Sequence, residues 1–170
     1  MIKVKVKLDI PYPEIRVEKE NLYYADLLGE DYAGMVSETT AVMLYSYQHF
    51  DKFNSDKEFS KIIEEIGRVE MMHLEMLGKT IKLLGKSPIY KVCEALSDNC
   101  VFWNSKYVDY KTSLKDMLKI DIFSEEAAIK TYTEHKKIIK DKYIREMLSR
   151  IILDEKRHLE IFKELLSNLN

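Results

Sequence analysis

The sequence predicts an all-α protein: a four-helix bundle with one long crossover between its second and third helices and an extended N-terminal arm. Its 170 residues contain only five Gly and three Pro, which favours helix over a turn-rich β fold. Apolar residues recur three or four positions apart along four long segments, which is the spacing of one helix face. Residues 85–112 separate the second segment from the third, and one class of four-helix bundle requires a connector of that length. We therefore divide the chain into an arm, residues 1–17, and a bundle, residues 18–170.

Composition argues against several classes of function. The net charge is −2 and no basic stripe occurs, so we expect no nucleic-acid partner. No apolar run approaches membrane-spanning length, and the N-terminal residues lack the apolar stretch of a signal peptide, so we expect a cytoplasmic protein without membrane contact. Cys93 and Cys100 form no CxxC motif. We interpret them as buried thiols or a chance pair and do not expect a disulfide framework.

The arm and the first helix come first along the chain. Residues 2–10 alternate Lys with apolar side chains, a strand-like period with no partner strand, and the two prolines that follow enforce an extended path. We expect the arm to lie on the body of the protein or on a neighbouring subunit. From about residue 19 to residue 53 the period is helical, with a late start or a kink near Gly29 or Gly34. One face of this helix carries Tyr32, Met35, Glu38, Val42, Tyr45 and His49.

The second helix has a start signal and a stop signal. Ser55 with Glu58 three residues later resembles a capping box, which marks a helix N-terminus. The apolar period then runs to about Leu84, and Gly85 is a common helix terminator. In the crossover that follows, we expect short helical turns around Tyr90–Leu96.

The third and fourth helices follow the crossover. Thr112 or Ser113 is the expected N-cap of the third helix. A short break near Lys140 and Asp141 is expected to separate it from the fourth.

Two Glu-x-x-His motifs lie inside the apolar stripes of the second and fourth helices. They are Glu70 to His73 and Glu155 to His158. Residues three apart on a helix lie on the same face, so a carboxylate and an imidazole in this arrangement can bind one metal ion together. Alone, each motif has an appreciable chance rate and is more often a surface pair than a ligand pair.

An internal repeat strengthens the metal interpretation. Glu38 precedes the first motif by 32 residues and Glu125 precedes the second by 30, and each has a tyrosine, Tyr45 or Tyr132, seven residues further on. The chain therefore consists of two similar helical hairpins. Packed about a pseudo-twofold axis, they bring four Glu and two His to one level of the core.

Burial makes this set of residues informative. Charged Glu is almost never fully buried unless it is paired or bound to metal. Four buried carboxylates cannot be neutralised by two imidazoles, whereas two divalent cations would balance them. Of the adjacent pair in the third helix, we choose Glu125 as the ligand, because it is in phase with Ile122 and Ile129, while Glu126 is in phase with a polar face.

The sequence resembles the ferritin-like superfamily from about residue 20 to its C-terminus, with rubrerythrins, bacterioferritins and manganese catalases as the most similar types. The segments that carry this resemblance are Val36-Ser37-Glu38, Glu70–Leu77, Asp121–Glu125 and Ile152–His158. The resemblance implies two Fe or two Mn ions per chain. It assigns bridging roles to Glu70 and Glu155, one ion to Glu38 and His73, and the other ion to Glu125 and His158.

Residues around the ligands have two interpretations each. Tyr45 and Tyr132 either hydrogen-bond ligand carboxylates or are core aromatics with satisfied hydroxyls. Asp154 can accept the second N–H of a ligand His from the opposite half, whereas Val69 stands where bacterioferritins have an acid, so the two ions can differ. Met71 stands where bacterioferritins carry their haem-binding Met, but methionine at helical spacing is more often a packing residue, so we do not favour haem.

A carboxylate-rich site with two imidazoles suits Fe or Mn and does not select between them. We expect an oxidoreductase that acts on hydrogen peroxide or O₂, by rubrerythrin-like peroxide reduction or manganese-catalase-like disproportionation. The sequence has no paired CxxC motifs of a rubredoxin-like domain, so a peroxide reductase would need a separate electron-donor protein. The alternatives are a ferroxidase or iron-storage protein of bacterioferritin type and a structural, metal-stabilised assembly protein. In each case we expect a homo-oligomer.

Overall fold

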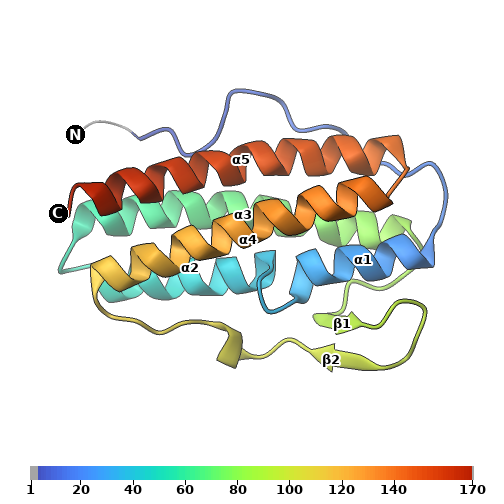
Figure 1. Cartoon of the computed structure of the whole chain (residues 1–170), viewed down its shortest axis with the longest axis horizontal. Helices are drawn as coiled ribbons and strands as arrows, with labels where there is room; N and C mark the ends of the chain where they lie inside the picture. Colours follow the sequence, from blue (N-terminus) through green and yellow to red (C-terminus); the bar gives the residue numbers. More distant parts are fainter. Residues whose placement is uncertain (1–3, 170) are drawn as a thin grey trace.

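The structure is a computed structural model that describes residues 4–169, and it is a four-helix bundle. Two helices lie end to end and together form the first rod of the bundle, and three long helices form the others (Figure 1). The helices are α1 (Leu22–Ala33), α2 (Glu38–Lys52), α3 (Lys57–Leu83), α4 (Leu114–Ile138) and α5 (Lys142–Ser167). The predicted all-α bundle with a long crossover between its second and third rods is confirmed.

The first rod is interrupted at residues 34–37, beside Gly34, which is one of the two glycines near which a kink was predicted, and the interruption is complete enough to make two helices. Gly34 ends α1, and a Cβ there would lie 2.5 Å from the carbonyl oxygen of Glu30, which only glycine avoids. Ser37 starts α2 by accepting a hydrogen bond from the backbone N–H of Thr40. The interruption places Met35 at the surface, 66% exposed, instead of in the predicted apolar face.

The ends of the other helices follow local signals. Asp56, not Ser55, caps α3 by accepting from the backbone N–H of Phe59, so the predicted capping box does not form. The stop at Gly85 is confirmed, since this residue has a φ of +100°, a conformation that glycine adopts without a steric penalty. Ser113 caps α4, and Asp141 caps α5 after the predicted break.

The crossover contains a β-hairpin, so the helical turns expected around Tyr90–Leu96 are wrong. Strand β1 (Lys91–Cys93) pairs antiparallel with β2 (Cys100–Phe102), and the 3₁₀-helix η1 (Ser105–Tyr107) follows. The hairpin lies beside α1 at the outer side of the bundle (Figure 1). Local apolar content did not reveal these strands because each is only three residues long.

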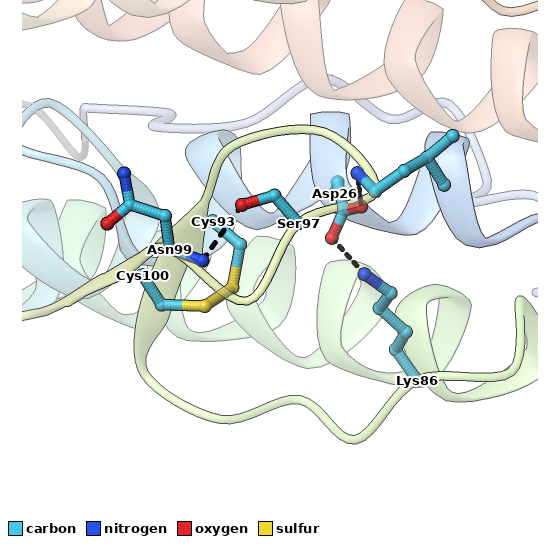
Figure 2. The surroundings of a disulfide bond; sticks show 7 residues. Asp26, Lys86, Cys93, Ser97, Asn99 and Cys100 are labelled. Atoms are coloured by element: carbon cyan, nitrogen blue, oxygen red, sulfur yellow. Dashed lines mark hydrogen bonds and ion pairs between the residues drawn. A yellow bond between two sulfur atoms is a disulfide. The ribbon is translucent and has the colours of Figure 1, made fainter.

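Cys93 and Cys100 face each other across the hairpin and form a disulfide bond, which corrects their interpretation as buried thiols or a chance pair (Figure 2). The hairpin tip is also attached to α1, because the carboxylate of Asp26 accepts a hydrogen bond from the backbone N–H of Leu96 at 2.9 Å. Lys86 forms an ion pair with the same carboxylate. The hydrogen bond from Leu96 and the ion pair of Lys86 hold the crossover against the first rod, whereas the disulfide joins the two strands of the hairpin to each other.

The N-terminal segment runs along the outside of α5 on the body of its own chain (Figure 1). Buried Arg150 donates hydrogen bonds from Nε to the carbonyl oxygen of Ile10 at 2.9 Å and from Nη2 to that of Leu8 at 3.2 Å. Further along, Arg157 donates to the carbonyl oxygen of Lys5 at 2.9 Å. The first three residues of the predicted arm, 1–3, lie outside the described part of the chain.

The apolar core falls into two clusters along the bundle. One cluster centres on Leu28, Leu77 and Leu148, and the other on Ile63, Leu118 and Phe162. Glu70 and His73 of α3 are buried and lie between the two clusters in sequence. Among the described residues, no helix has the length and apolar character needed to cross a lipid bilayer.

Candidate metal centre

The structure brings the six predicted ligand residues together in the middle of the bundle. Each of the four rods contributes, and each of the six side chains is buried, with at most 3% of its surface exposed. They form two overlapping sets of three Glu and one His, in which the ligand atoms lie within 4.8 Å of one another. The sets are Glu38, Glu70, His73 and Glu155, and Glu70, Glu125, Glu155 and His158.

One set surrounds the imidazole of His73. Its Nδ1 lies 3.0 Å from Oε2 of Glu70, 3.0 Å from Oε1 of Glu155 and 3.7 Å from Oε1 of Glu38. Three carboxylates therefore converge on one imidazole nitrogen, each from a different rod of the bundle.

The other set repeats this arrangement around His158. Its Nδ1 lies 2.8 Å from Oε1 of Glu70, 3.3 Å from Oε2 of Glu155 and 3.8 Å from Oε1 of Glu125. Glu70 and Glu155 contribute to both sets, one oxygen to each imidazole. This sharing is the arrangement expected of carboxylates that bridge two ions.

Several atoms in this cluster are buried without a hydrogen bond. They include Oε1 of Glu70, Oε1 of Glu155 and Nδ1 of His158, which lie within ion-pair distance of neighbours but not in hydrogen-bond geometry. Buried polar atoms are normally satisfied, and leaving one unpaired costs about 1–3 kcal/mol. The unsatisfied atoms and the carboxylate–imidazole donor set both fit divalent cations at this position.

Burial and the charges of neighbouring residues shift the pKa values of the carboxyl and imidazole groups in this cluster. Burial raises the pKa values of Glu38 and Glu125 well above their usual range, and the nearby charge of Glu155 adds to both. Burial opposes the charged form of His158, but Glu70 and Glu155 outweigh it and raise the pKa of that imidazole to about 9. In the metal-free protein, protons therefore balance part of the negative charge that metal ions would otherwise neutralise.

The two predicted tyrosines hydrogen-bond the carboxylates across the bundle. The hydroxyl of Tyr45 on α2 donates to Oε1 of Glu125 on α4 at 2.5 Å. Reciprocally, the hydroxyl of Tyr132 on α4 donates to Oε1 of Glu38 on α2. Both rings are also buried in the apolar core. The exchange of partners between α2 and α4 follows the pseudo-twofold relation between the two hairpins.

Behind His73 lies a group of residues that the sequence reasoning identified only in part. Oδ2 of Asp154 lies 3.3 Å from Nε2 of His73, as the sequence suggested for an acid of the opposite half. Arg150, one turn earlier on α5, forms an ion pair with Asp154 at 2.7 Å, and Tyr12 donates to it at 2.5 Å. Although burial opposes ionisation, the bonds with His73, Arg150 and Tyr12 lower the pKa of Asp154 to about 2. The roles of Tyr12 and Arg150 were missed, although an Arg inside the apolar stripe of α5 was a visible signal.

The second imidazole has no such support. Nε2 of His158 is buried and has no hydrogen-bond partner among the described residues. Val69 precedes Glu70 on α3 just as Asp154 precedes Glu155 on α5, and Val69 is an apolar core residue. The two halves are therefore alike in their carboxylates and imidazoles but different in what lies behind each imidazole.

Two other buried polar pairs near the centre were not predicted. Asp121, one turn before the candidate ligand Glu125 on α4, accepts a hydrogen bond from Gln48 at 2.7 Å. His135 contacts Asp31 at 2.7 Å. By contrast, the alternative ligand Glu126 is exposed and pairs with Lys163, as expected, and Met71 is 51% exposed on the surface of α3.

A cavity of about 210 Å³ leads to the carboxylates between α2 and α4. Its inner wall contains the four predicted Glu ligands together with Tyr45 and Tyr132. Met35 and Phe123 also line it and are themselves exposed, so the cavity reaches the surface. Tyr107 and Asp109 bring the crossover to its wall. Neither His73 nor His158, the two candidate imidazole ligands, lines the cavity, so a small molecule entering it would meet the carboxylates first.

Comparison with known proteins agrees with this architecture. The rubrerythrin family model matches residues 32–166. A relative described as a probable manganese catalase, from Clostridium acetobutylicum, is 29% identical over 172 aligned residues, which cover 92% of this chain and 76% of the relative.

Solved structures of similar fold include KatB, a manganese catalase from Anabaena PCC7120, with a TM-score of 0.84 at 23% identity, covering 95% of this chain and 79% of that one. The bacterioferritin of Desulfovibrio desulfuricans matches with a TM-score of 0.72 at 23% identity, covering 86% of this chain and 79% of that one. The predicted ferritin-like fold is thereby confirmed.

Proposed function

Because the chain belongs to the rubrerythrin family and buries two Glu–His sets that share two carboxylates, we propose that it is a dinuclear manganese or iron oxidoreductase acting on hydrogen peroxide or O₂. The observation that carries this proposal is the pair of overlapping ligand sets at the end of a cavity that reaches the surface. A structural ion would not need such access.

The proposed ligand roles follow from the distances. Glu38 and His73 would hold one ion, and Glu125 and His158 would hold the other. Glu70 and Glu155 would serve both ions, because each presents one oxygen to each imidazole. Carboxylate-rich ligation of this kind suits manganese and iron in both of their common oxidation states.

Disproportionation of hydrogen peroxide is the reaction we favour. One peroxide is oxidised to O₂ and a second is reduced to two water molecules, so electrons balance without an external donor. The similarity to a probable manganese catalase along 92% of the chain supports this choice. When bound, the two ions would supply the exchange of two electrons, and the protein supplies access through the cavity and hydrogen bonds to the outer carboxylates.

Tyr45 and Tyr132 position those outer carboxylates. Each hydroxyl donates to Oε1 of a carboxylate that lines the cavity, and this hydrogen bond holds Glu125 or Glu38 in a defined orientation. The orientation of the second carboxylate oxygen of Glu38 and of Glu125 is then fixed by the protein. Both tyrosines also line the cavity, beside the space that a small substrate would enter.

Ferroxidase activity is the second candidate. Iron held by the same residues could be oxidised from Fe(II) to Fe(III) by O₂. The fold also resembles that of a bacterioferritin. A peroxide reductase is a variant of the first candidate that would take its electrons from a separate donor protein. We also propose that the protein is a homo-oligomer. If the oligomer is a large hollow shell, iron storage is favoured over catalysis.

Metal analysis combined with turnover tests the proposal. Protein purified without chelator is expected to contain about two manganese or iron ions per chain and to release O₂ from hydrogen peroxide. Glu70→Ala and His158→Ala should lose both metal and activity, whereas Glu126→Ala, at the exposed neighbouring position on α4, should keep both. Stoichiometric metal without O₂ release, together with rapid Fe(II) oxidation, would favour the ferroxidase. If the unmutated protein contains neither manganese nor iron, the proposed dinuclear centre is refuted.

A further inference from the structure

We propose that the two metal positions are unequal, so that the position of Glu38 and His73 binds its ion more tightly and fills before the position of Glu125 and His158. This inference rests on the proposed dinuclear centre and adds an order of loading to it. It comes from what surrounds each imidazole on the side away from the ligand carboxylates.

The imidazole of His73 is held from behind. Its Nε2 faces Asp154 at 3.3 Å, and an acceptor there keeps the proton on Nε2 and leaves Nδ1 free to bind a metal ion. The ring of Tyr12 packs edge-on against the imidazole, with centroids 6.3 Å apart. This imidazole is therefore set in both orientation and tautomer before any ion arrives.

Asp154 is itself held from several directions. It pairs with Arg150 on its own helix and accepts hydrogen bonds from the hydroxyl of Tyr12 at 2.5 Å and the backbone N–H of Leu8 at 3.3 Å. Since Tyr12 and Leu8 belong to the N-terminal arm, the arm is part of the support for one metal position. The other position receives no comparable contact from the arm among the described residues.

Within residues 4–169, the imidazole of His158 has no acceptor behind it. Its Nε2 is buried without a hydrogen-bond partner there, and the place corresponding to Asp154 is occupied by Val69. If Nδ1 of His158 binds a metal ion, the proton must lie on Nε2, where it would be buried without a partner. Metal binding on this side therefore leaves a buried donor unsatisfied, whereas on the other side it does not.

The expected size of the difference comes from the effect of partners that support metal ligands. Loss of such a partner typically weakens metal binding about 10–100-fold. Titration of the chelator-stripped full chain with Mn²⁺, followed by calorimetry and by the free Mn²⁺ signal in electron paramagnetic resonance, should show two affinities at least about tenfold apart. Glu125→Ala should remove the weaker one and Glu38→Ala the tighter one.

Three further variants test the cause. Val69→Asp supplies the missing acceptor to His158 and should bring the weaker affinity toward the tighter one. Val69→Ala makes the same space without an acceptor and should leave the affinities apart. Asp154→Asn removes the charge behind His73 with little change in shape and should weaken the tighter affinity, with folding of each variant checked by circular dichroism.

The outcomes separate the inference from the proposed function. Two Mn²⁺ ions bound with equal affinity would overturn the order of loading and leave the dinuclear centre standing. No Mn²⁺ binding by the unmutated chain would overturn both. If Val69→Ala narrows the difference as much as Val69→Asp, or if Asp154→Asn leaves the tighter affinity unchanged, the missing acceptor is not the cause and the inference fails.

Discussion

Replacement of Arg150 by methionine should destabilise the protein and release its N-terminal arm at the same time. The guanidinium is buried on α5, forms an ion pair with Asp154 at 2.7 Å and donates to the carbonyl oxygens of Ile10 and Leu8. Methionine has a similar length and can fill the space, so the change removes charge and hydrogen bonds with little loss of packing.

The structure gives the expected magnitude. Removing one partner of a buried ion pair costs about 3–5 kcal/mol, because the other charge is left unpaired. Asp154 retains contacts with His73, Tyr12 and the N–H of Leu8, so we expect the lower end, about 3 kcal/mol in the free energy of unfolding. For a chain of this length, that corresponds to a fall in Tm of roughly 6–12 °C.

Urea denaturation of the metal-free protein measures the global effect, and amide hydrogen exchange of residues 4–17 measures the local one. Arg157→Met is the matched control, because Arg157 also donates to the arm, at the carbonyl oxygen of Lys5, but its side chain is partly exposed. Arg157→Met should lower the free energy of unfolding by less than about 1 kcal/mol. Equal losses for the two variants, or a loss in Arg150→Met without faster exchange in the arm, would refute this account of the arm.

Three other changes should have distinct effects. Tyr45→Phe removes the buried donor to Glu125 and should lower the free energy of unfolding of the metal-free protein by about 1–3 kcal/mol in urea denaturation; an unchanged midpoint would contradict the role of this hydroxyl. Cys93→Ala opens the hairpin loop and should lower the local stability of residues 91–102 by about 2–3 kcal/mol, seen as faster amide exchange there with unchanged metal content. Burial opposes the charged form of His135, but its bond with Asp31 raises the pKa of His135 to about 10, so the unfolded chain gives up this proton first and stability falls as pH rises from about 6.5 to 10. His135→Gln should make that fall shallower by up to about 1.4 kcal/mol per pH unit, and identical pH slopes for both proteins would contradict this ion pair.

The local pattern of the sequence was sufficient for most of the fold and for the six candidate ligands. Helical periodicity showed which face of each helix is buried, and a Glu in the middle of a buried face is a signal in itself. The same reasoning separated Glu125 from its neighbour Glu126, and the seven-residue spacing identified Tyr45 and Tyr132. The stop of α3 at Gly85 was also predictable, because it depends on the backbone preference of a single residue.

Other features depend on contacts between residues far apart in the sequence. The disulfide requires β1 and β2 to pair in one register, which three-residue strands do not specify by themselves. The sequence predicted a kink near Gly29 or Gly34, but the choice of Gly34 and the complete break there depend on how closely the backbone returns to Glu30.

The residue pattern by itself determined that four carboxylates and two imidazoles lie at one level of a helical bundle, because helix periodicity is a local property. Only the tertiary structure decided what lies behind each imidazole. Asp154, supported by Tyr12 more than 140 positions earlier in the chain, faces His73, whereas Nε2 of His158 has no partner among the described residues. The pairing of such distant residues depends on the path of the arm over α5, which no local pattern encodes.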